Sequence, residues 1–515
     1  MRPVVCAPLL ALLFLLAAPP GTAGQEKPHD HPAPEKLGKV SFPTSCAPGV
    51  QAKFERAVAL LHSFAYSVAD AAFEEVARED PKCAMAGWGE AMANFHQIWD
   101  DRISPAGMAR GRAAIAWAQG VRASTARERG YINAVALMFM DTQSAPYEDR
   151  LQRYEQAMER LAANNPQDPE TRIFDALALL AIAAPDDKSH RNQKKAADLL
   201  EPLHRQFPDH PGVVHYLIHA CDNAEMAQRG LEPARVYANI APSAPHALHM
   251  PSHIFTRLGM WDDSIRSNLA ARAAAHAQGD IGEELHAMDY LEYAYLQSGR
   301  EADAAGVLAD LRGMGALPAG FKTGYAATAI PVRYAVERRR WTEAANCAAV
   351  EGATPWVEAV AVWARAVGRA RTGDIDGSQK EITKLMELEH ESQSWREFYW
   401  SEQVRIQELA ASGWYAQANG ESAEAALALR RAAALEDAIE KRPVTPGPVM
   451  PAREQLADLL LEQGHAKEAL TEYEASLLVA PGRRRALQGA RAAAERAGDA
   501  AKAREFRLAL ERGTP

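Results

Sequence analysis

The sequence predicts an all-α fold in which helix pairs stack into a solenoid. Alternation of apolar and polar residues, the mark of a half-buried strand, is nearly absent from the chain. Apolar residues instead recur with helical spacing, and Gly and Pro interrupt them at intervals of roughly three to four dozen residues. Similar segments follow one another at this interval. Stacked repeats, each too small to bury its own apolar face, are the architecture that such a pattern indicates.

The composition agrees with a folded chain of closely packed helices. The chain has 515 residues, of which 48% are hydrophobic and 24% are charged. Alanine dominates the hydrophobic set, and alanine favours helices. The length suffices for one extended array or for several domains.

Two repeats near the C-terminus define the pattern. In Arg453–Pro481 a first helix is expected to end at Gly464, and a second one carries Ala469 and stops at the proline. The next unit repeats this with Gly498, 34 residues after the first glycine, and a small residue again follows. Both units resemble the tetratricopeptide-repeat (TPR) family, whose period is 34 residues. The resemblance implies a right-handed superhelical solenoid.

Looser copies of the pattern cover most of the chain, and they are weakest over 100–190 and 310–400. They include "HSFAYSVADAAFEEVAREDP", "QKKAADLLEPLHRQFP", "SHIFTRLGMWDDSI", "DYLEYAYLQSGREADAAGVL", "VERRRWTEAANCA" and "YAQANGESAEAALAL". Segments such as "HPGVVHYLIHACD" and "YANIAPSAPHALHMPSHIFTRLGMWDDSI" are also similar to a group of exported bacterial TPR proteins that has no established activity. That resemblance implies a fold and a location, and no reaction.

The N-terminus has the layout of a secretory signal peptide. Arg2 precedes an apolar stretch over 7–18, and small residues follow, so we expect cleavage after Ala23 or Gly24. The apolar stretch is shorter than the roughly 20 residues of a membrane span. We therefore expect a periplasmic or secreted protein that has no membrane span after cleavage. The expected parts are a signal peptide (1–23), a flexible lead-in (24–45), an N-terminal array (46–440), a Pro-rich loop (441–451) and a C-terminal TPR pair (452–515).

Export permits disulfides. Cys46 and Cys83 flank the first expected helix pair, which makes them the favoured bridge.

Two histidine pairs stand one repeat apart. His215 and His219 are four residues apart, as are His249 and His253, and each residue of the second pair follows its counterpart by 34 residues. Residues i and i+4 share a helix face. The pairs therefore fall on equivalent first helices of neighbouring repeats, and in TPR arrays these helices line the concave surface. Four imidazoles between adjacent helices could meet at one ion.

Nearby residues extend this stripe of side chains. Asp222 lies one turn after the first pair, and His246 lies one turn before the second. Imidazole suits zinc and copper, and Asp222 could add a carboxylate ligand. Pro251 interrupts the second pair because it lacks a backbone donor, although a helix beginning near Leu248 would tolerate it in the first turn.

Three interpretations of the histidines remain open. They could pack in a tight interior, hold a metal, or line a polar groove for a peptide or a small anion, where binding would depend on pH. In the next unit, counting back from Gly299 matches Asp289 and Tyr293 to the second histidine pair, so they are candidate ligand-binding residues. The glutamates around them are expected to be solvated.

A further candidate patch lies near the N-terminus, in "WGEAMANFHQIW". Core packing is the favoured interpretation of this apolar helix, and hydrophobic anchors in a binding groove are the alternative. The residues concerned are Trp88, Glu90, Met92 and His96.

Charge and motifs narrow the function. The formal net charge is −10, and nucleic-acid-binding proteins are usually basic. "HYLIH" lacks the glutamate of a zinc-protease motif, and neither a Gly-x-Ser-x-Gly elbow nor a phosphate-binding loop occurs. We expect an exported scaffold that binds a protein or peptide partner of the cell envelope in its concave groove, with a His-lined site for zinc or copper. The alternatives are a metal-dependent enzyme that uses the stacked pairs with Asp222 or Asp289, and a purely structural assembly scaffold.

Overall fold

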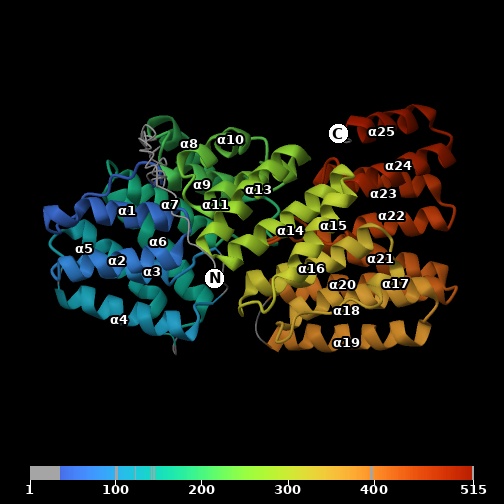
Figure 1. Cartoon of the computed structure of the whole chain (residues 1–515), viewed down its shortest axis with the longest axis horizontal. Helices are drawn as coiled ribbons and strands as arrows, with labels where there is room; N and C mark the ends of the chain where they lie inside the picture. Colours follow the sequence, from blue (N-terminus) through green and yellow to red (C-terminus); the bar gives the residue numbers. More distant parts are fainter. Residues whose placement is uncertain are drawn as a thin grey trace, which may run out of the picture. The chain divides into compact units, whose positions relative to one another are not determined.

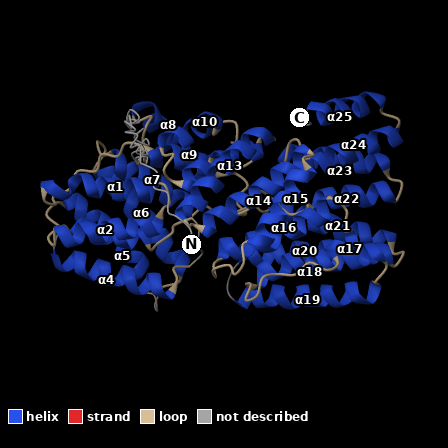
Figure 2. Cartoon of the chain, viewed as in Figure 1, coloured by secondary structure: helices blue, strands red, loops and turns tan. Residues whose placement is uncertain are grey.

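The computed structural model describes residues 35–98, 102–121, 123–140, 142, 145–394 and 398–512. The expected signal peptide and residues 24–34 of the expected lead-in lie outside this part. Within it, the regular structure is entirely helical (Figure 2), as predicted. The helices belong to one compact unit, Lys36–Pro515. No helix in these ranges is long and apolar enough to cross a bilayer.

The helices follow one another with short connections (Figure 1). A short 3-10 helix (Pro48–Val50) precedes α1 (Gln51–His62), α2 (Tyr66–Glu79), α3 (Ala84–Ala93), α4 (Pro105–Val121), α5 (Ala126–Phe139), α6 (Tyr147–Asn164), α7 (Pro169–Ala181) and α8 (Arg191–Gln206). The middle of the chain forms α9 (Pro211–Cys221), α10 (Leu231–Ile240), α11 (Pro245–His249), α12 (Pro251–Arg257), α13 (Trp261–Gln278), α14 (Ile281–Ser298), α15 (Glu301–Gly313), α16 (Phe321–Glu337) and α17 (Trp341–Ala344). The last part forms α18 (Pro355–Thr372), α19 (Ile375–Ser394), α20 (Phe398–Ala418), α21 (Ser422–Asp437), α22 (Ala452–Glu462), α23 (Ala466–Val479), α24 (Arg484–Ala497) and α25 (Ala500–Arg512).

These helices form TPR-like pairs. Each helix packs against its successor, and the first helices also pack against one another, for example α7 on α9, α14 on α16 and α22 on α24. The pairs continue through the regions where the sequence pattern is weak. The structure therefore confirms the predicted all-α solenoid of TPR-like helix pairs.

Small residues and glycine turns explain the pairing. Ala196, Ala304 and Ala469 are completely buried, so the two helices of a pair can approach closely. Gly299 and Gly498 end their helices with positive φ, a conformation in which glycine avoids the strain of a Cβ atom. The sequence pattern thus encodes both the contact and the turn.

Part of the expected lead-in packs on the array. The backbone N–H of Lys39 donates to the carbonyl of Asp209 (2.9 Å), and the backbone N–H of Lys36 donates to the hydroxyl of Ser243 (2.8 Å). Phe42 is completely buried. Residues 36–45 therefore form a packed strap, although the sequence analysis expected them to be flexible.

The C-terminal repeats contact the middle of the array. α24 packs against α14, although ten helices separate them along the chain. Arg483, at the start of α24, donates to Glu454 (2.8 Å), Glu337 (2.7 Å) and the hydroxyl of Tyr293 (3.2 Å). In an ideal solenoid each unit touches only its neighbours. Here a buried ionic cluster adds a contact between distant repeats.

Two glycine substitutions test the helix packing. A Cβ at Gly489 in α24 would overlap the ring of Tyr473, whose hydroxyl is held by Asp458. We expect Gly489→Ala to lower the free energy of unfolding by about 1–3 kcal/mol, the usual range for overpacking. Gly306→Ala is the control, because no atom lies within 4 Å of a Cβ there. It should raise stability by up to about 1 kcal/mol through helix propensity. Urea unfolding followed by circular dichroism measures both, and equal effects would contradict the packing.

Candidate metal centre

Histidines from two neighbouring repeats form a first histidine trio. His215 and His219 lie on α9, and His246 lies on α11. Their nearest ligand nitrogens all lie within 4.8 Å of one another. The Nε2 atoms of His215 and His219 are 3.0 Å apart. The trio is buried, with exposed fractions of 0%, 9% and 2% in that order.

A second histidine trio follows one repeat later. It consists of His249 at the end of α11, His253 on α12 and His286 on α14. Its ligand nitrogens also lie within 4.8 Å of one another, and the Nε2 atoms of His249 and His253 are 3.0 Å apart. The sequence analysis expected the four paired histidines to meet at one ion. The structure instead places each pair with a third histidine.

Pro251 does not disturb the second pair. Met250 keeps helical dihedral angles between α11 and α12, and Pro251 occupies the first position of α12, where a missing N–H is tolerated. His249 and His253 therefore keep the i, i+4 relation across the break, and their rings meet with centroids 5.0 Å apart.

Hydrogen bonds fix the tautomers of the second pair. His249 Nδ1 donates to Asn268 Oδ1 (2.6 Å), and the amide nitrogen of Asn268 is itself engaged with the carbonyl of Ser264 (2.8 Å). His253 Nδ1 donates to the carboxylate of Asp222 (2.9 Å). A neutral imidazole carries one N–H, so both Nε2 atoms present lone pairs to each other. Such an arrangement is repulsive unless a cation lies between the two nitrogens.

The first trio has a similar backing. His215 Nδ1 donates to the backbone carbonyl of His62 (2.6 Å). His246 Nδ1 faces the carboxylate of Glu283 (3.2 Å). Histidines that bind metals usually donate their other ring N–H to a carbonyl or a carboxylate, which orients the ring and raises its basicity. Both trios have this second layer of partners.

Burial keeps the imidazoles neutral. Desolvation lowers the pKa of His253 to about 4, and the hydrogen bond from Asp222 only partly opposes it. Burial also lowers the pKa values of four other members well below the usual value, with further lowering by neighbouring histidines. These members are His215, His219, His249 and His286. The neutral imidazole is the form that binds a metal.

One aromatic ring covers each trio. The ring of Phe64 lies 4.4–5.7 Å, between centroids, from all three rings of the first trio. The ring of Tyr290 lies 4.7–5.4 Å from all three rings of the second. Phe64 has a φ of 54°, a strained conformation for a bulky residue that persists only where its surroundings enforce it.

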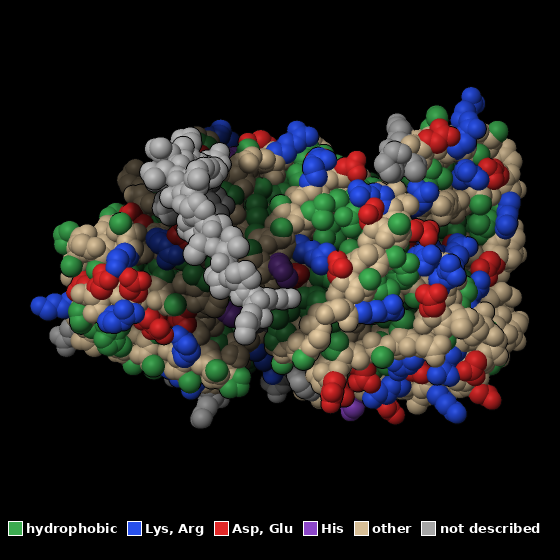
Figure 3. Space-filling model, in the orientation of Figure 1, with side chains coloured by type: hydrophobic (Ala, Val, Ile, Leu, Met, Phe, Trp, Pro, Cys, Tyr) green, Lys and Arg blue, Asp and Glu red, His purple; other side chains and the backbone are tan. Residues whose placement is uncertain are grey.

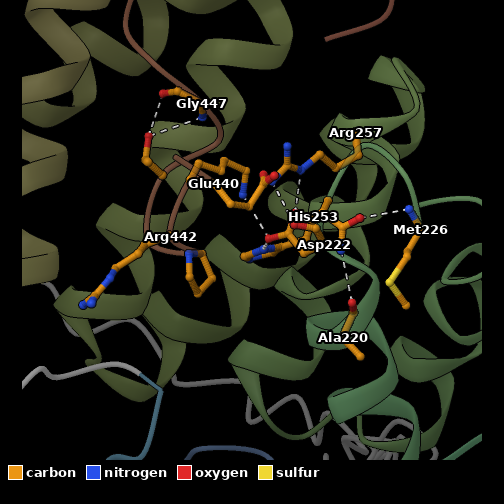
Figure 4. A network of polar contacts seen from close by, with 12 residues as sticks. Ala220, Asp222, Met226, His253, Arg257, Glu440, Arg442 and Gly447 are labelled. Atoms are coloured by element: carbon orange, nitrogen blue, oxygen red, sulfur yellow. Dashed lines mark hydrogen bonds and ion pairs between the residues drawn. The ribbon is translucent and has the colours of Figure 1, made fainter. Parts of the chain in front are cut away.

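Asp222 lies behind the second trio and contacts its outer edge. Its carboxylate accepts from His253 Nδ1, from Arg257 Nε (2.9 Å) and from Lys441 Nζ (2.9 Å) (Figure 4). Burial alone would raise the pKa of Asp222, but Lys441 and Arg257 hold it well below its usual value. The sequence analysis treated Asp222 as a metal ligand. Its position instead makes it the support of a ligand.

The Pro-rich loop closes this side of the centre. Besides Lys441, Glu440 binds Arg257 (2.6 Å), and the hydroxyl of Tyr290 donates to the carbonyls of Pro443 and Thr445 (both 3.1 Å). Figure 4 shows Glu440 directed toward Arg257 and the side chain of Arg442 directed away from this network. The loop thus packs against α12 and α14.

Asp289 and Tyr293 lie in another cluster. Asp289 pairs with Arg333 (3.3 Å), and the hydroxyl of Tyr293 accepts from Arg483. The count back from Gly299 gave the wrong register, because one period of 34 residues after His249 ends at Glu283. Neither Asp289 nor Tyr293 is among the residues that the two trios bring together. Glu284 and Glu292 are buried, with exposed fractions of 6% and 0%, so the expectation of solvated glutamates was wrong for them.

Sequence reasoning missed His286 and Glu283. The signal for both was the 34-residue period itself, which ends at Glu283, one helical turn before His286.

The N-terminal patch is largely core. Trp88 and Met92 on α3 are 1% and 2% exposed, and Trp88 packs among aromatic rings such as Phe42 and Tyr131. Glu90 is partly buried, and desolvation with Asp70 and Glu74 raises its pKa to about 7. His96 stacks on Tyr66 (4.3 Å between centroids). These residues stand apart from both trios.

The favoured cysteine pair is bridged. Cys46 and Cys83 form a disulfide in the structure.

A buried carboxylate supports the first trio from below. Glu170 on α7 accepts from His62 Nε2 (3.0 Å) and from His210 Nε2 (2.9 Å). Desolvation would raise the pKa of Glu170, but the two imidazoles hold it at about 2. Because the carbonyl of His62 orients His215, this cluster positions the first trio.

A cavity of about 400 Å³ adjoins the first trio. It lies between α6, the end of α7, the start of α20 and residues 440–443, and it reaches His219 and Asp222. The surface of the molecule mixes acidic and basic side chains without a large patch of one sign (Figure 3).

Comparisons with known proteins give only remote likenesses. No protein-family model matches the chain, and no curated protein matches it. The solved structure of the human IFIT1 dimer with PPP-AAAA resembles it with a TM-score of 0.39 at 13% identity, over 88% of this chain and 88% of that chain. The structure of yeast Tom70 has a TM-score of 0.31 at 12% identity, over 88% and 90%. Likenesses at these scores are too distant to inform the site.

The buried neutral histidines predict a stability that depends on pH. Between about pH 6.5 and pH 4, unfolded imidazoles bind protons while His253 stays neutral in the folded chain. The unfolded state therefore binds more protons, and the free energy of unfolding should rise with pH in this window. His253 alone contributes about 3 kcal/mol, fully present above pH 6.5. Urea unfolding of chelator-treated protein across this range measures the slope. His253→Asn should flatten it, and a slope unchanged by that variant would contradict the assignment.

Proposed function

We propose that the chain is a TPR-like metal-binding protein that holds one transition-metal ion in each histidine trio. One observation carries the proposal: His249 and His253 face each other through unprotonated Nε2 atoms 3.0 Å apart, because both Nδ1 atoms donate elsewhere. A shared cation removes the repulsion. The first trio lies one repeat earlier and has the same i, i+4 pair, a third histidine and a similar backing.

The donor set favours zinc or copper. Each trio offers three imidazole nitrogens, and imidazole binds both metals well. The carboxylates nearby, Asp222 and Glu283, face Nδ1 atoms of the histidines and thus support the ligands. Three protein ligands leave a fourth position for water or another molecule.

The scaffold and its location complete the proposal. The TPR-like array fits a protein-binding scaffold in general, and a protein or peptide partner in the cell envelope remains a prediction. The histidines are 0–9% exposed, so they suit an ion better than a peptide. The disulfide between Cys46 and Cys83 supports a place of work in an oxidising compartment such as the periplasm.

Metal analysis of the untagged, mature chain tests this proposal. Inductively coupled plasma mass spectrometry should find two ions of zinc or copper per chain. His215→Ala and His249→Ala should each remove one ion, and the double variant should remove both, because each pair supplies two of three ligands. His465→Ala is the control, since His465 is exposed on the C-terminal repeats. A chain that holds no metal even after reconstitution would rule the proposal out.

A second experiment separates ligands from their supports. Asp222→Asn should weaken metal binding at the second trio by about 10–100-fold, because it removes the carboxylate that orients His253. Glu440→Gln is the matched control. Glu440 also binds Arg257 but contacts no histidine of the trio, so its loss should leave the affinity unchanged. Competition with a chelator of known affinity gives both dissociation constants, and equal losses in the two variants would contradict the support role.

A further inference from the structure

The two trios differ in their access to open space. His219 of the first trio, 9% exposed, lines the cavity of about 400 Å³. The members of the second trio are 1–2% exposed and line none of the cavities found among the described residues. Metal sites with a structural role are closed, whereas sites that act on a ligand keep a position open.

The size and the apolar wall of the cavity suit a small organic molecule. A volume of about 400 Å³ lies within the range of small-molecule sites, which is roughly 300–1,000 Å³. Leu151 of α6, Leu180 of α7 and Phe398 at the start of α20 contribute apolar side chains. An apolar body of one ring fits such a lining.

The charges around the cavity favour an anion. Two of its acids already bind cations: Asp222 binds Arg257 and Lys441, and Glu440 binds Arg257 and Lys188. Arg442 also lines the cavity, with its guanidinium over the ring of Tyr399 (5.1 Å to the centroid) and directed away from the Asp222 network (Figure 4). A metal ion at His219 would add further positive charge.

We propose that the first trio is a metal centre open to a ligand, and that the cavity admits a small carboxylate with an apolar body to the fourth position of that metal. The guanidinium of Arg442 binds the anion electrostatically, and the second trio remains closed. This inference rests on the proposed function, since it requires a metal in the first trio.

Cobalt(II) reports the ligands of each site through its visible absorption. We load the chain with cobalt and titrate it with benzoate, using benzamide as the uncharged comparison. Benzoate should change the spectrum of the wild type and of His249→Ala, which keeps the first trio. It should leave the spectrum of His215→Ala unchanged, and benzamide should have little effect in any variant.

Substitution of the cation tests the pocket itself. Arg442→Gln should raise the dissociation constant of benzoate at least about tenfold, as expected for loss of a charge-assisted contact, while cobalt content stays at two per chain. Arg430→Gln, at a surface arginine paired with Glu468, should bind benzoate like the wild type.

The outcomes distinguish the two proposals. A chain that binds two cobalt ions but whose spectrum is unaffected by benzoate, or affected only through the second trio, overturns this inference and leaves the proposed function intact. An unchanged affinity in Arg442→Gln also overturns it. A chain that binds no cobalt overturns both.

Discussion

The facing imidazoles of His249 and His253 set the conditions that the centre of the molecule must meet. Two lone pairs held 3.0 Å apart in a buried site repel each other, and burial prevents either ring from gaining a proton at neutral pH. The surroundings hold the pair in place: Asn268 and Asp222 fix the tautomers, and Tyr290 covers the rings. Such preorganisation is what a metal site requires of its protein, because ligands must be neutral, oriented and shielded before the ion arrives.

The repeat period made the paired histidines predictable from the sequence. Equal spacing of His215 and His249 placed them on equivalent helices, and the i, i+4 rule placed each partner on the same face. The third member of each trio was harder to find. His286 follows a long second helix, α13, and counting from a glycine turn led to Asp289. Contacts across 153 residues, such as that of His215 with His62, leave no local signal in one sequence.

The same distinction applies to the fold. Gly and Ala at repeat positions encode local pairing, so the all-α solenoid was predictable. The Pro-rich loop carried no such code. Its composition suggested a break, whereas Glu440 and Lys441 bind residues of the middle repeats about two hundred positions earlier. Arg483 likewise joins the last repeats to α14 and α16 through charges whose partners only the folded chain brings together. Long-range polar contacts therefore turned a chain of neighbours into a connected body.

The bond between Lys441 and Asp222 has a mechanical meaning. It joins positions 219 residues apart, and the carboxylate that accepts from Lys441 also accepts from His253. The intervening helices thus form a ring whose clasp touches the second trio. An ion that prefers the closed ring stabilises it by mass action, so occupancy and ring closure share one equilibrium. A repeat protein of this kind can register metal supply as tension along its own contour, and any partner resting on the intervening helices would sense the change.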